Sequence, residues 1–341
     1  IDMKKNQISA MLILAILVLL TACSQEVEEA SDIPETFNDN ITVYTSKDGL
    51  IDDFISSLRV EHFKDRDIIW IGTWKGLVKF DDERWVVYTE EDGLAQNHIT
   101  DISIDSEHHL WVSSISLKKL GGLSFYNGHN WKSHRKLGDE NEPGNIITIH
   151  VDSKKRVWTG SWGNGINMFD GDNWVNFNKE KSGIPSDEIL DIAEYNGHIW
   201  FATKYSGAFY LDESESENTW VSVNEHSSNI INNSICSLAS TDDRLWIGTW
   251  GGVSLFEKGN WTNYTSWGEK LADNFVRVID IDVAKDAVYF GTDKGLSIFE
   301  EGKWDTVTID DGLPSNKILS IANTQRHVWI GTDKGLVRML K

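Results

Sequence analysis

Apolar and polar residues alternate in short runs along most of the chain, which is the pattern of half-buried β-strands. The run Ile-Thr-Asp-Ile-Ser-Ile at 99–104 is typical. Glycine, asparagine and aspartate separate the runs, and these residues favour tight turns. No long amphipathic helical periodicity follows residue 23. The pattern therefore predicts an all-β fold built from short strands.

One short phrase, an aromatic residue followed by an apolar, a small and a hydroxyl residue in most copies, returns seven times. Its aromatic positions are Trp70, Trp111, Trp158, Trp200, Trp246, Tyr289 and Trp329, separated by steps of 41, 47, 42, 46, 43 and 40 residues. Steps of this length are typical of repeats that encode one four-stranded propeller blade. A second tryptophan opens the predicted fourth strand in six units: Trp85, Trp131, Trp174, Trp220, Trp261 and Trp304. The sequence predicts one domain, a seven-bladed β-propeller over residues 40–341.

The two ends of the repeat region predict how the ring closes. Only three strands of the seventh unit remain after Trp329. Residues 41–45, followed by Asp-Gly-Leu, match residues 85–89, which are also followed by Asp-Gly-Leu. We expect the N-terminal strand to complete the last blade, which removes the exposed sheet edge of an open array.

The first residues have the pattern of a targeting segment. Met3-Lys4-Lys5 is positive, residues 8–20 are apolar but short for a membrane span, and small residues precede Cys23. This resembles a bacterial lipoprotein signal, which implies that residues 1–22 are cleaved and that Cys23 carries the lipid. The acid-rich segment 23–39 is then a flexible tether. We expect a protein anchored by lipid alone in the bacterial envelope, at the outer membrane; an ordinary secretory signal or an uncleaved anchor is the alternative.

Charge and cysteine content exclude several functions. The formal net charge of −21 disfavours binding to nucleic acid or to anionic lipid headgroups. Once Cys23 is lipidated, only Cys236 remains, so the sequence offers no disulfide framework and no CxxC site. Cys236 lies in a predicted first strand and is interpreted as a small buried apolar side chain. We assign no metal site and no cofactor, and expect a monomer.

The repeat unit as a whole resembles the two-component regulator propeller repeat. The matching elements are Trp-Ile-Gly-Thr with Gly-Leu three residues on, a later Trp-x-x-Tyr-Thr, and Asp-Gly-Leu-Pro-Ser-Asn at 311–316. The resemblance covers residues 40–341. It implies a sensor-type propeller outside the cytoplasm, since members of this family form periplasmic sensors of hybrid two-component systems, several of them implicated in glycan sensing. This chain shows a single propeller without a signalling module, so binding is the function that we expect.

The residue directly after the repeated phrase changes from blade to blade. It is Trp74, Ile115, Trp162, Lys204, Trp250, Asp293 and Asp333 in turn. In a propeller the turn between strands two and three lies at the mouth of the ring, the usual ligand site. We take Trp74, Trp162, Trp250, Lys204, Asp293 and Asp333, with the adjacent Tyr205, as candidate ligand contacts. Exposed aromatic rings there suit a saccharide or a planar ligand; the alternative is that the tryptophans only pack on the neighbouring blade.

A second series of short polar residues precedes the predicted first strands: Asp53, Asn97, Asp187, Asn233, Asn274 and Asn316. Side chains of this kind bond local backbone groups and hold turns. We expect them to stabilise the connections between blades and not to contact a ligand.

Two other functional classes stay open. An enzyme of the propeller lyase or hydrolase kind would need an acid and a base at the mouth, where His98, Glu188 and Tyr205 are the nearest candidates; we assign no catalytic residue. A protein-interaction scaffold for an envelope complex is the other class. For that role the long turn 113–121 of blade two, with Lys118 and Lys119, is the candidate surface.

Overall fold

The computed structural model describes residues 40–64, 66–81, 84–116, 121–134, 145–214, 219–268 and 271–341. The predicted signal peptide, Cys23 and the tether lie outside the described residues, as do Lys118 and Lys119. Within these ranges, no helix combines the length and the apolar character needed to cross a membrane.

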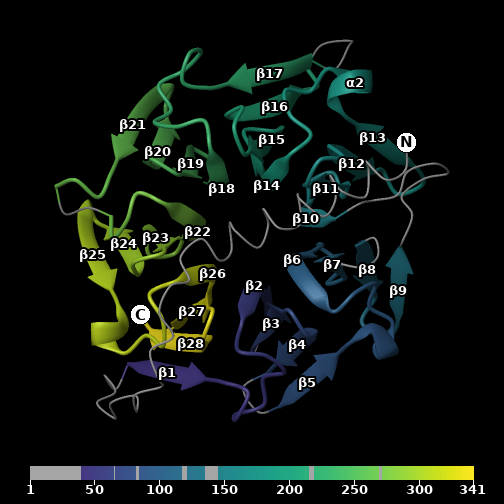
Figure 1. The fold of residues 1–341 in the computed structure, drawn as a ribbon, viewed down its shortest axis with the longest axis vertical. Coiled ribbons are helices and arrows are strands. Elements are labelled where there is room, and N and C mark those ends of the chain that lie inside the picture. The colour runs from purple at the N-terminus through teal and green to yellow at the C-terminus, as the bar shows by residue number, and fades with distance from the viewer. Residues whose placement is uncertain are drawn as a thin grey trace, which may run out of the picture. The chain divides into compact units, whose positions relative to one another are not determined.

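Residues 40–341 form seven four-stranded antiparallel sheets arranged as the blades of a propeller, as predicted (Figure 1). The first strand of each blade lies nearest the centre. In order, the first strands are β2 (Ile55–His62), β6 (His98–Ile104), β10 (Ile146–Val151), β14 (Ile189–Tyr195), β18 (Ile235–Ser240), β22 (Val276–Asp282) and β26 (Ile318–Asn323). The second strands are β3 (Asp67–Thr73), β7 (Leu110–Ile115), β11 (Val157–Ser161), β15 (His198–Thr203), β19 (Arg244–Thr249), β23 (Ala287–Thr292) and β27 (His327–Thr332).

The outer half of the first six blades carries the second series of tryptophans. The third strands are β4 (Leu77–Phe80), β8 (Gly122–Tyr126), β12 (Ile166–Phe169), β16 (Ala208–Asp212), β20 (Gly252–Glu257), β24 (Leu296–Glu300) and β28 (Gly335–Leu340). The fourth strands are β5 (Trp85–Tyr88), β9 (Trp131–His134), β13 (Trp174–Phe177), β17 (Thr219–Val223), β21 (Asn260–Tyr264), β25 (Lys303–Val307) and β1 (Ile41–Tyr44).

Helical structure in the described part is confined to the connections between blades. It consists of one turn of α-helix, α2 (Lys179–Ser182), and the 3-10 turns η1 (Glu90–Asp92) and η2 (Ile309–Asp311). Both 3-10 turns are closed by a capping box, in which Thr89 or Thr308 bonds an aspartate three residues on, and a left-handed glycine follows. The Asp-Gly pairs of the sequence are therefore turn residues.

The N-terminal strand completes the seventh blade. β1 pairs antiparallel with β28, placing Ile41 opposite Met339 and Tyr44 opposite Leu336. Figure 1 shows these two ends of the propeller lying side by side. Tyr44 also stacks on Trp329, with ring centroids 6.0 Å apart. Strand pairing and aromatic packing thus join both ends of the repeat in one sheet.

The tryptophan of the repeated phrase packs between adjacent blades. Trp70 is 1% exposed, and its ring lies 6.1 Å from that of Tyr126 in blade two. Trp246 is fully buried, with its ring 5.4 Å from that of Phe290 in blade six. Burying such large rings supplies much of the free energy that holds neighbouring blades together.

The glycine of the phrase is required where the next blade comes closest. A Cβ atom on Gly291 would lie 2.5 Å from Val278 Cγ1 and 2.7 Å from Ile318 Cγ2 of blade seven. At Gly248, the same repeat position in blade five, the nearest atom would be 3.0 Å away. Glycine is not required in blades two and four, where Ser113 and Ala202 occupy this position.

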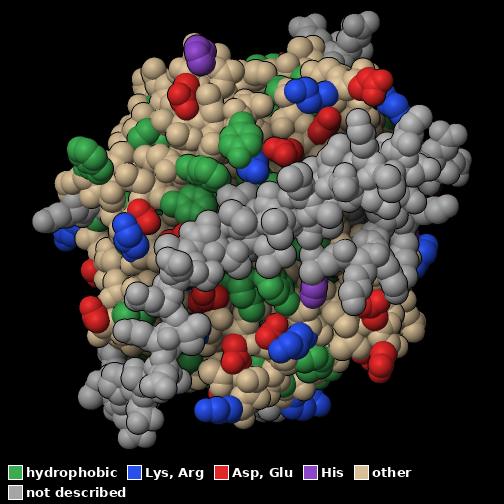
Figure 2. Space-filling view, in the orientation of Figure 1, with side chains coloured by type: hydrophobic (Ala, Val, Ile, Leu, Met, Phe, Trp, Pro, Cys, Tyr) green, Lys and Arg blue, Asp and Glu red, His purple; other side chains and the backbone are tan. Residues whose placement is uncertain are grey.

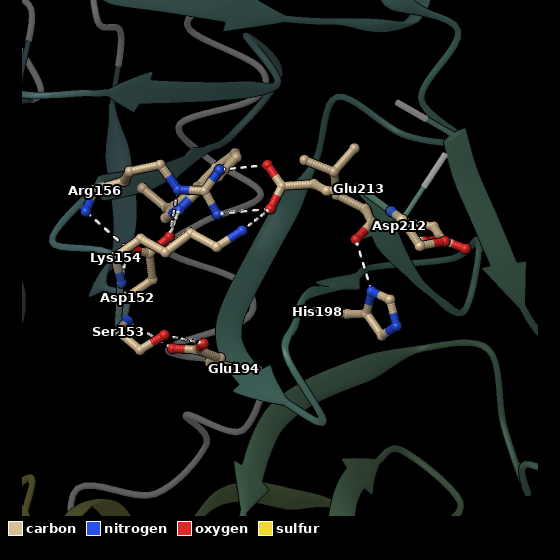
Figure 3. Close-up of polar contacts among 11 residues, drawn as sticks. Asp152, Ser153, Lys154, Arg156, Glu194, His198, Asp212 and Glu213 are labelled. Atoms are coloured by element: carbon tan, nitrogen blue, oxygen red, sulfur yellow. Dashed lines mark hydrogen bonds and ion pairs between the residues drawn. The ribbon is translucent and has the colours of Figure 1, made fainter. Parts of the chain in front are cut away.

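On the face opposite the mouth, ion pairs connect blades three and four (Figure 3). Arg156 Nε donates to Asp152 at 2.6 Å and its Nη2 donates to Glu213 at 3.2 Å. The same Asp152 oxygen accepts the indole N–H of Trp158 at 2.8 Å. Ser153 N also donates to Glu194 of blade four at 2.7 Å. Because these groups satisfy one another, we assign this face a structural role.

Gly291→Ala is expected to lower the free energy of unfolding by about 1–3 kcal/mol, because the added methyl group overpacks against Val278 of its own blade and Ile318 of blade seven. Gly248→Ala is the matched control and should cost clearly less, since its neighbours need to move only slightly. Urea unfolding of the two variants and the wild type measures the difference. Equal losses would show that this contact does not set the position's preference for glycine.

Candidate functional site

Each candidate position at the mouth lies within a turn that a hydroxyl group closes. In blade one, Thr73 Oγ1 donates to the carbonyl of Gly76 at 2.7 Å and accepts the N–H of Lys75 at 3.1 Å. The hydroxyl that ends the phrase bonds the equivalent glycine carbonyl in all seven blades. The turn is therefore held by its own backbone and one hydroxyl, which leaves the side chain after the phrase without a part in closing it.

The polar residues that precede the first strands hold the connections between blades, which confirms the prediction for this series. Asn97 Oδ1, for example, accepts the N–H of Glu90 at 2.8 Å. Each of the six side chains accepts a backbone N–H from the preceding connection: Asp53, Asn97, Asp187, Asn233, Asn274 and Asn316. Their oxygens are thus committed to the scaffold.

Aromatic and cationic side chains contact one another along the mouth from blade three to blade five. Lys204 Nζ lies 4.5 Å from the ring centroid of Trp162 and 4.9 Å from that of Tyr205. The Tyr205 ring meets Trp250 edge to face, with centroids 6.3 Å apart. These contacts cross two blade boundaries.

The series continues into blade six. Trp250 meets Phe275 edge to face at 5.6 Å, and the Arg277 guanidinium lies 4.4 Å from the Phe275 centroid. Arg277 also donates two hydrogen bonds to Asp293, at 2.6 and 2.9 Å. We call six residues the mouth arc: Trp162, Lys204, Tyr205, Trp250, Phe275 and Arg277.

Part of the mouth arc is open to solvent. Tyr205 is 58% exposed and Trp250 38%, whereas Trp74 and Trp162 are half-buried. Figure 2 shows hydrophobic side chains on this face over β2 and over β18 and β22, with acidic and basic side chains beside them. Trp250 also donates its indole N–H to Cys236 Sγ at 3.2 Å, which fixes the ring while its face stays accessible.

Trp74 belongs to a separate cluster in blades one and two. Its ring lies 4.2 Å from that of Phe54 and 5.9 Å from that of His98. Ile115, at the equivalent position of blade two, is only 7% exposed. The candidate tryptophans therefore do not form one continuous ring of contacts.

Charged groups gather at blades six and seven. Asp293 is engaged by Arg277, and Lys317 has its pKa lowered by burial and by the charge of Arg277. Asp333 Oδ1 is buried, and no hydrogen-bond donor in the described ranges reaches it. An unsatisfied buried oxygen costs free energy until a donor arrives, typically about 1–3 kcal/mol.

Sequence reasoning missed one column of mouth residues. The position directly after the turn-holding polar residue supplies Phe54, Phe275 and Lys317, and also His98, which the sequence offered only as an acid–base candidate. All four contact or lie near the candidates above. A positional signal was present, because each of these residues directly follows a turn-holding polar residue and so has a fixed place in the repeat. Their side-chain types vary too widely to form a recognisable sequence motif.

The first strands bring a second set of polar groups to the centre of the ring. A bulge interrupts the register between first and second strands in every blade. Side chains beside the bulges bond the next blade: Asp101 accepts the N–H of Ile149 at 3.0 Å, and Asp191 accepts that of Leu238 at 2.7 Å. These carboxyl groups thus join consecutive first strands.

Asp101 and Asp191 share one hydroxyl group. Thr148 Oγ1 lies 3.2 Å from Asp101 Oδ2 and 3.4 Å from Asp191 Oδ1. Burial raises the pKa of Asp191 to about 7, with the charge of Asp101 adding to the rise and the Leu238 N–H opposing it. Burial also raises the pKa of Asp101, against the charge of Arg59. Since Thr148 has one proton to donate, a proton on Asp191 lets both contacts be hydrogen bonds.

Asp191→Asn is expected to change how stability depends on pH. The pKa of Asp191 is about 7 in the folded protein, above its ordinary value of 3.8. The unfolded chain therefore releases this proton first, and the Asp191 contribution to stability falls as pH rises from about 4 to about 7, by up to about 1.4 kcal/mol per pH unit.

Urea unfolding of wild type and variant across that range measures the effect. The difference between their free energies of unfolding should change up to about pH 7 and stay constant above it. A difference that is constant throughout would contradict the assignment.

The three side chains considered for acid–base chemistry occupy separate surroundings. His98 lies beside Trp74, Glu188 forms a backbone bridge with Trp162, and Tyr205 lies in the mouth arc. In the part of the chain that the structure describes, no hydrogen bond joins two of these side chains, and no group of three or more His, Cys, Asp or Glu is placed to hold a metal ion. Desolvation raises the pKa of the Cys236 thiol to about 12, which keeps it protonated.

Comparison with known proteins identifies the fold. No family model and no curated protein matches the chain. The structure is similar to the extracellular domain of a hybrid two-component system from B. thetaiotaomicron, with a TM-score of 0.74 and 19% identity over 88% of this chain and 41% of that chain. This chain therefore spans about two fifths of that domain's length.

Two further solved structures share the architecture. One is PorZ, a surface component of the type-IX secretion system of Porphyromonas gingivalis, with a TM-score of 0.64 and 18% identity over 85% of this chain and 47% of that chain. The other is YCF48 bound to D1 peptide, with a TM-score of 0.62 and 16% identity over 91% of this chain and 100% of that chain. At these identities the likeness establishes the propeller fold alone.

Proposed function

We propose that this protein is an extracytoplasmic binding or sensing propeller that recognises a saccharide, or another small ligand with a flat apolar face, at its mouth and performs no chemistry. One observation carries the proposal: the mouth arc presents two exposed aromatic side chains, Tyr205 and Trp250, held in place by their neighbours. Such rings bind the apolar face of a pyranose while nearby polar groups bond its hydroxyls.

The hydrogen bonds that hold the turns and connections of the propeller do not use the candidate mouth side chains. These side chains are therefore available to bind a ligand, which supports a binding role. The phrase hydroxyls close the mouth turns, and the polar series closes the connections between blades. Candidate contacts such as Asp333 Oδ1 are left with no bonded donor among the described residues. The fold is also found in the extracellular domain of a hybrid two-component system, which supports an envelope location for this protein. Anchoring through a lipid on Cys23 is part of the proposal.

A protein-interaction scaffold is the second candidate. It is favoured by Trp267, which is 83% exposed in the connection between blades five and six and does not belong to the mouth arc. Exposed tryptophans are enriched at protein interfaces. The fold is shared with PorZ, a surface component of a secretion system.

Trp250→Ala is expected to weaken saccharide binding by about tenfold or more, because it removes a stacking face worth roughly 1 kcal/mol together with its buried area. A glycan array with the purified protein selects the probe, and calorimetry with that probe gives the affinities.

Trp267→Ala is the matched control, since it removes an equally large exposed ring outside the mouth arc. It should leave saccharide affinity unchanged. Binding that survives Trp250→Ala, or a partner protein lost only in Trp267→Ala, would favour the scaffold role instead.

A further inference from the structure

We propose that Lys204 is the specificity-determining residue of the mouth and that it binds the anionic group of an acidic saccharide, a carboxylate or a sulfate ester. This inference rests on the binding function proposed above and narrows its ligand class. It starts from the position of one ammonium group within the mouth arc.

Lys204 is a buried cation with aromatic neighbours on two sides. Only 8% of the residue is exposed, although the residue after it, Tyr205, is among the most exposed aromatics of the protein. Its Nζ lies 4.5 Å from the Trp162 centroid and 4.9 Å from that of Tyr205. The two rings hold the ammonium group next to the exposed part of the arc.

No acceptor oxygen in the described ranges bonds this ammonium group, and no carboxylate there pairs with it. Three other cations of the mouth are paired. Arg277 makes two bonds to Asp293, Lys75 lies 3.1 Å from Asp52, and Lys294 lies 3.5 Å from Asp273. Lys334 also has no ion-pair partner among the described residues, but it is exposed, so Lys204 is the buried one of these two unpaired lysines.

The physical chemistry of this arrangement favours an anion. Aromatic faces attract a cation, but they donate no lone pair to its three N–H groups. The ammonium group therefore keeps a need for acceptors, which a charged oxygen meets better than a neutral hydroxyl. An anion at Lys204 is also partly shielded from water, so that their attraction exceeds that of a surface pair.

Next to this cation, the mouth arc offers exposed aromatic rings on which the sugar ring of a ligand can stack. Tyr205 contacts Lys204 on one side and Trp250 on the other, so the cation and the exposed rings are continuous. A pyranose that stacks on these rings would carry an acidic substituent within reach of Lys204. A saccharide bearing a carboxylate or sulfate is the ligand class that uses both features.

The net charge of the protein favours short oligosaccharides as test ligands. With a formal charge of −21, the protein repels a long polyanion over most of its surface. Short acidic oligosaccharides keep the local contact and reduce this repulsion. They are therefore the appropriate test ligands.

Matched probes isolate the charge. The carboxylate arm compares a galacturonic acid trisaccharide with its full methyl ester, and the sulfate arm compares a sulfated galactose trisaccharide with its desulfated form. Calorimetry on the purified protein should give at least about tenfold tighter binding of the charged member in one arm, as expected for one charge-assisted contact. The arm that shows the difference identifies the anion.

Variants assign that preference to one residue. Lys204→Met keeps an unbranched side chain between the two rings, so it should lower the affinity for the charged probe about tenfold and leave the neutral probe unchanged. Lys204→Arg should retain the preference to within a few-fold. Lys294→Met, at an exposed mouth lysine, is the control and should retain it fully.

The outcomes separate this inference from the function on which it rests. Equal binding of charged and neutral probes, both lost in Trp250→Ala, overturns the role of Lys204 and keeps the saccharide site. A charge preference that survives Lys204→Met also overturns it. If no probe binds, or if only a short acidic peptide does, both the inference and the saccharide-binding function fall.

Discussion

The close approach of consecutive blades is the constraint on which the rest of this structure depends. A blade of four short strands buries too little apolar surface by itself, so each packs its second-strand aromatic residue against the next blade. The first strand of that next blade reaches the preceding phrase, where Ile318 leaves no room for a Cβ atom on Gly291. The seventh blade obeys the same rule through Trp329, whose neighbours include Tyr44 of the N-terminal strand and Phe80 of blade one.

This close approach explains the polar groups at the centre of the ring. Seven first strands converge there, and the bulge in each disrupts pairing with the second strand. Carboxyl and hydroxyl groups such as Asp101, Asp191 and Ser237 accept backbone N–H groups across blade boundaries instead. Their burial raises the pKa of Asp191 to about 7, so one set of contacts both joins blades and makes stability depend on protonation.

The repeated phrase predicted the fold, the closure and the turn-holding series, because each depends on a feature that every blade must share. The mouth contacts were only partly predictable. Trp250 and Lys204 follow the phrase directly and could be located, whereas Phe54 and Phe275 precede strands whose neighbours differ in every blade. The bulges could not be predicted, since one extra residue in a strand of alternating Ile, Val and Ser leaves no signal in a single sequence. Side-chain pairing within a blade, as between Arg277 and Asp293 of blade six, depends on side-chain conformations as well.

The division of tasks within the repeat gives the mouth its chemical freedom. Thr203 and the equivalent hydroxyls close their turns, and Asn233 and its equivalents hold the connections, so folding places no demand on the side chain between them. A residue at such a position that is nevertheless buried, charged and without an acidic partner in the described ranges has no evident role in stability. The aromatic rings of Trp162 and Tyr205 attract the Lys204 ammonium group but accept no conventional hydrogen bond from its N–H groups. That unused bonding capacity distinguishes Lys204 from the paired cations Arg277, Lys75 and Lys294, and it is the physical basis of the ligand recognition that we propose.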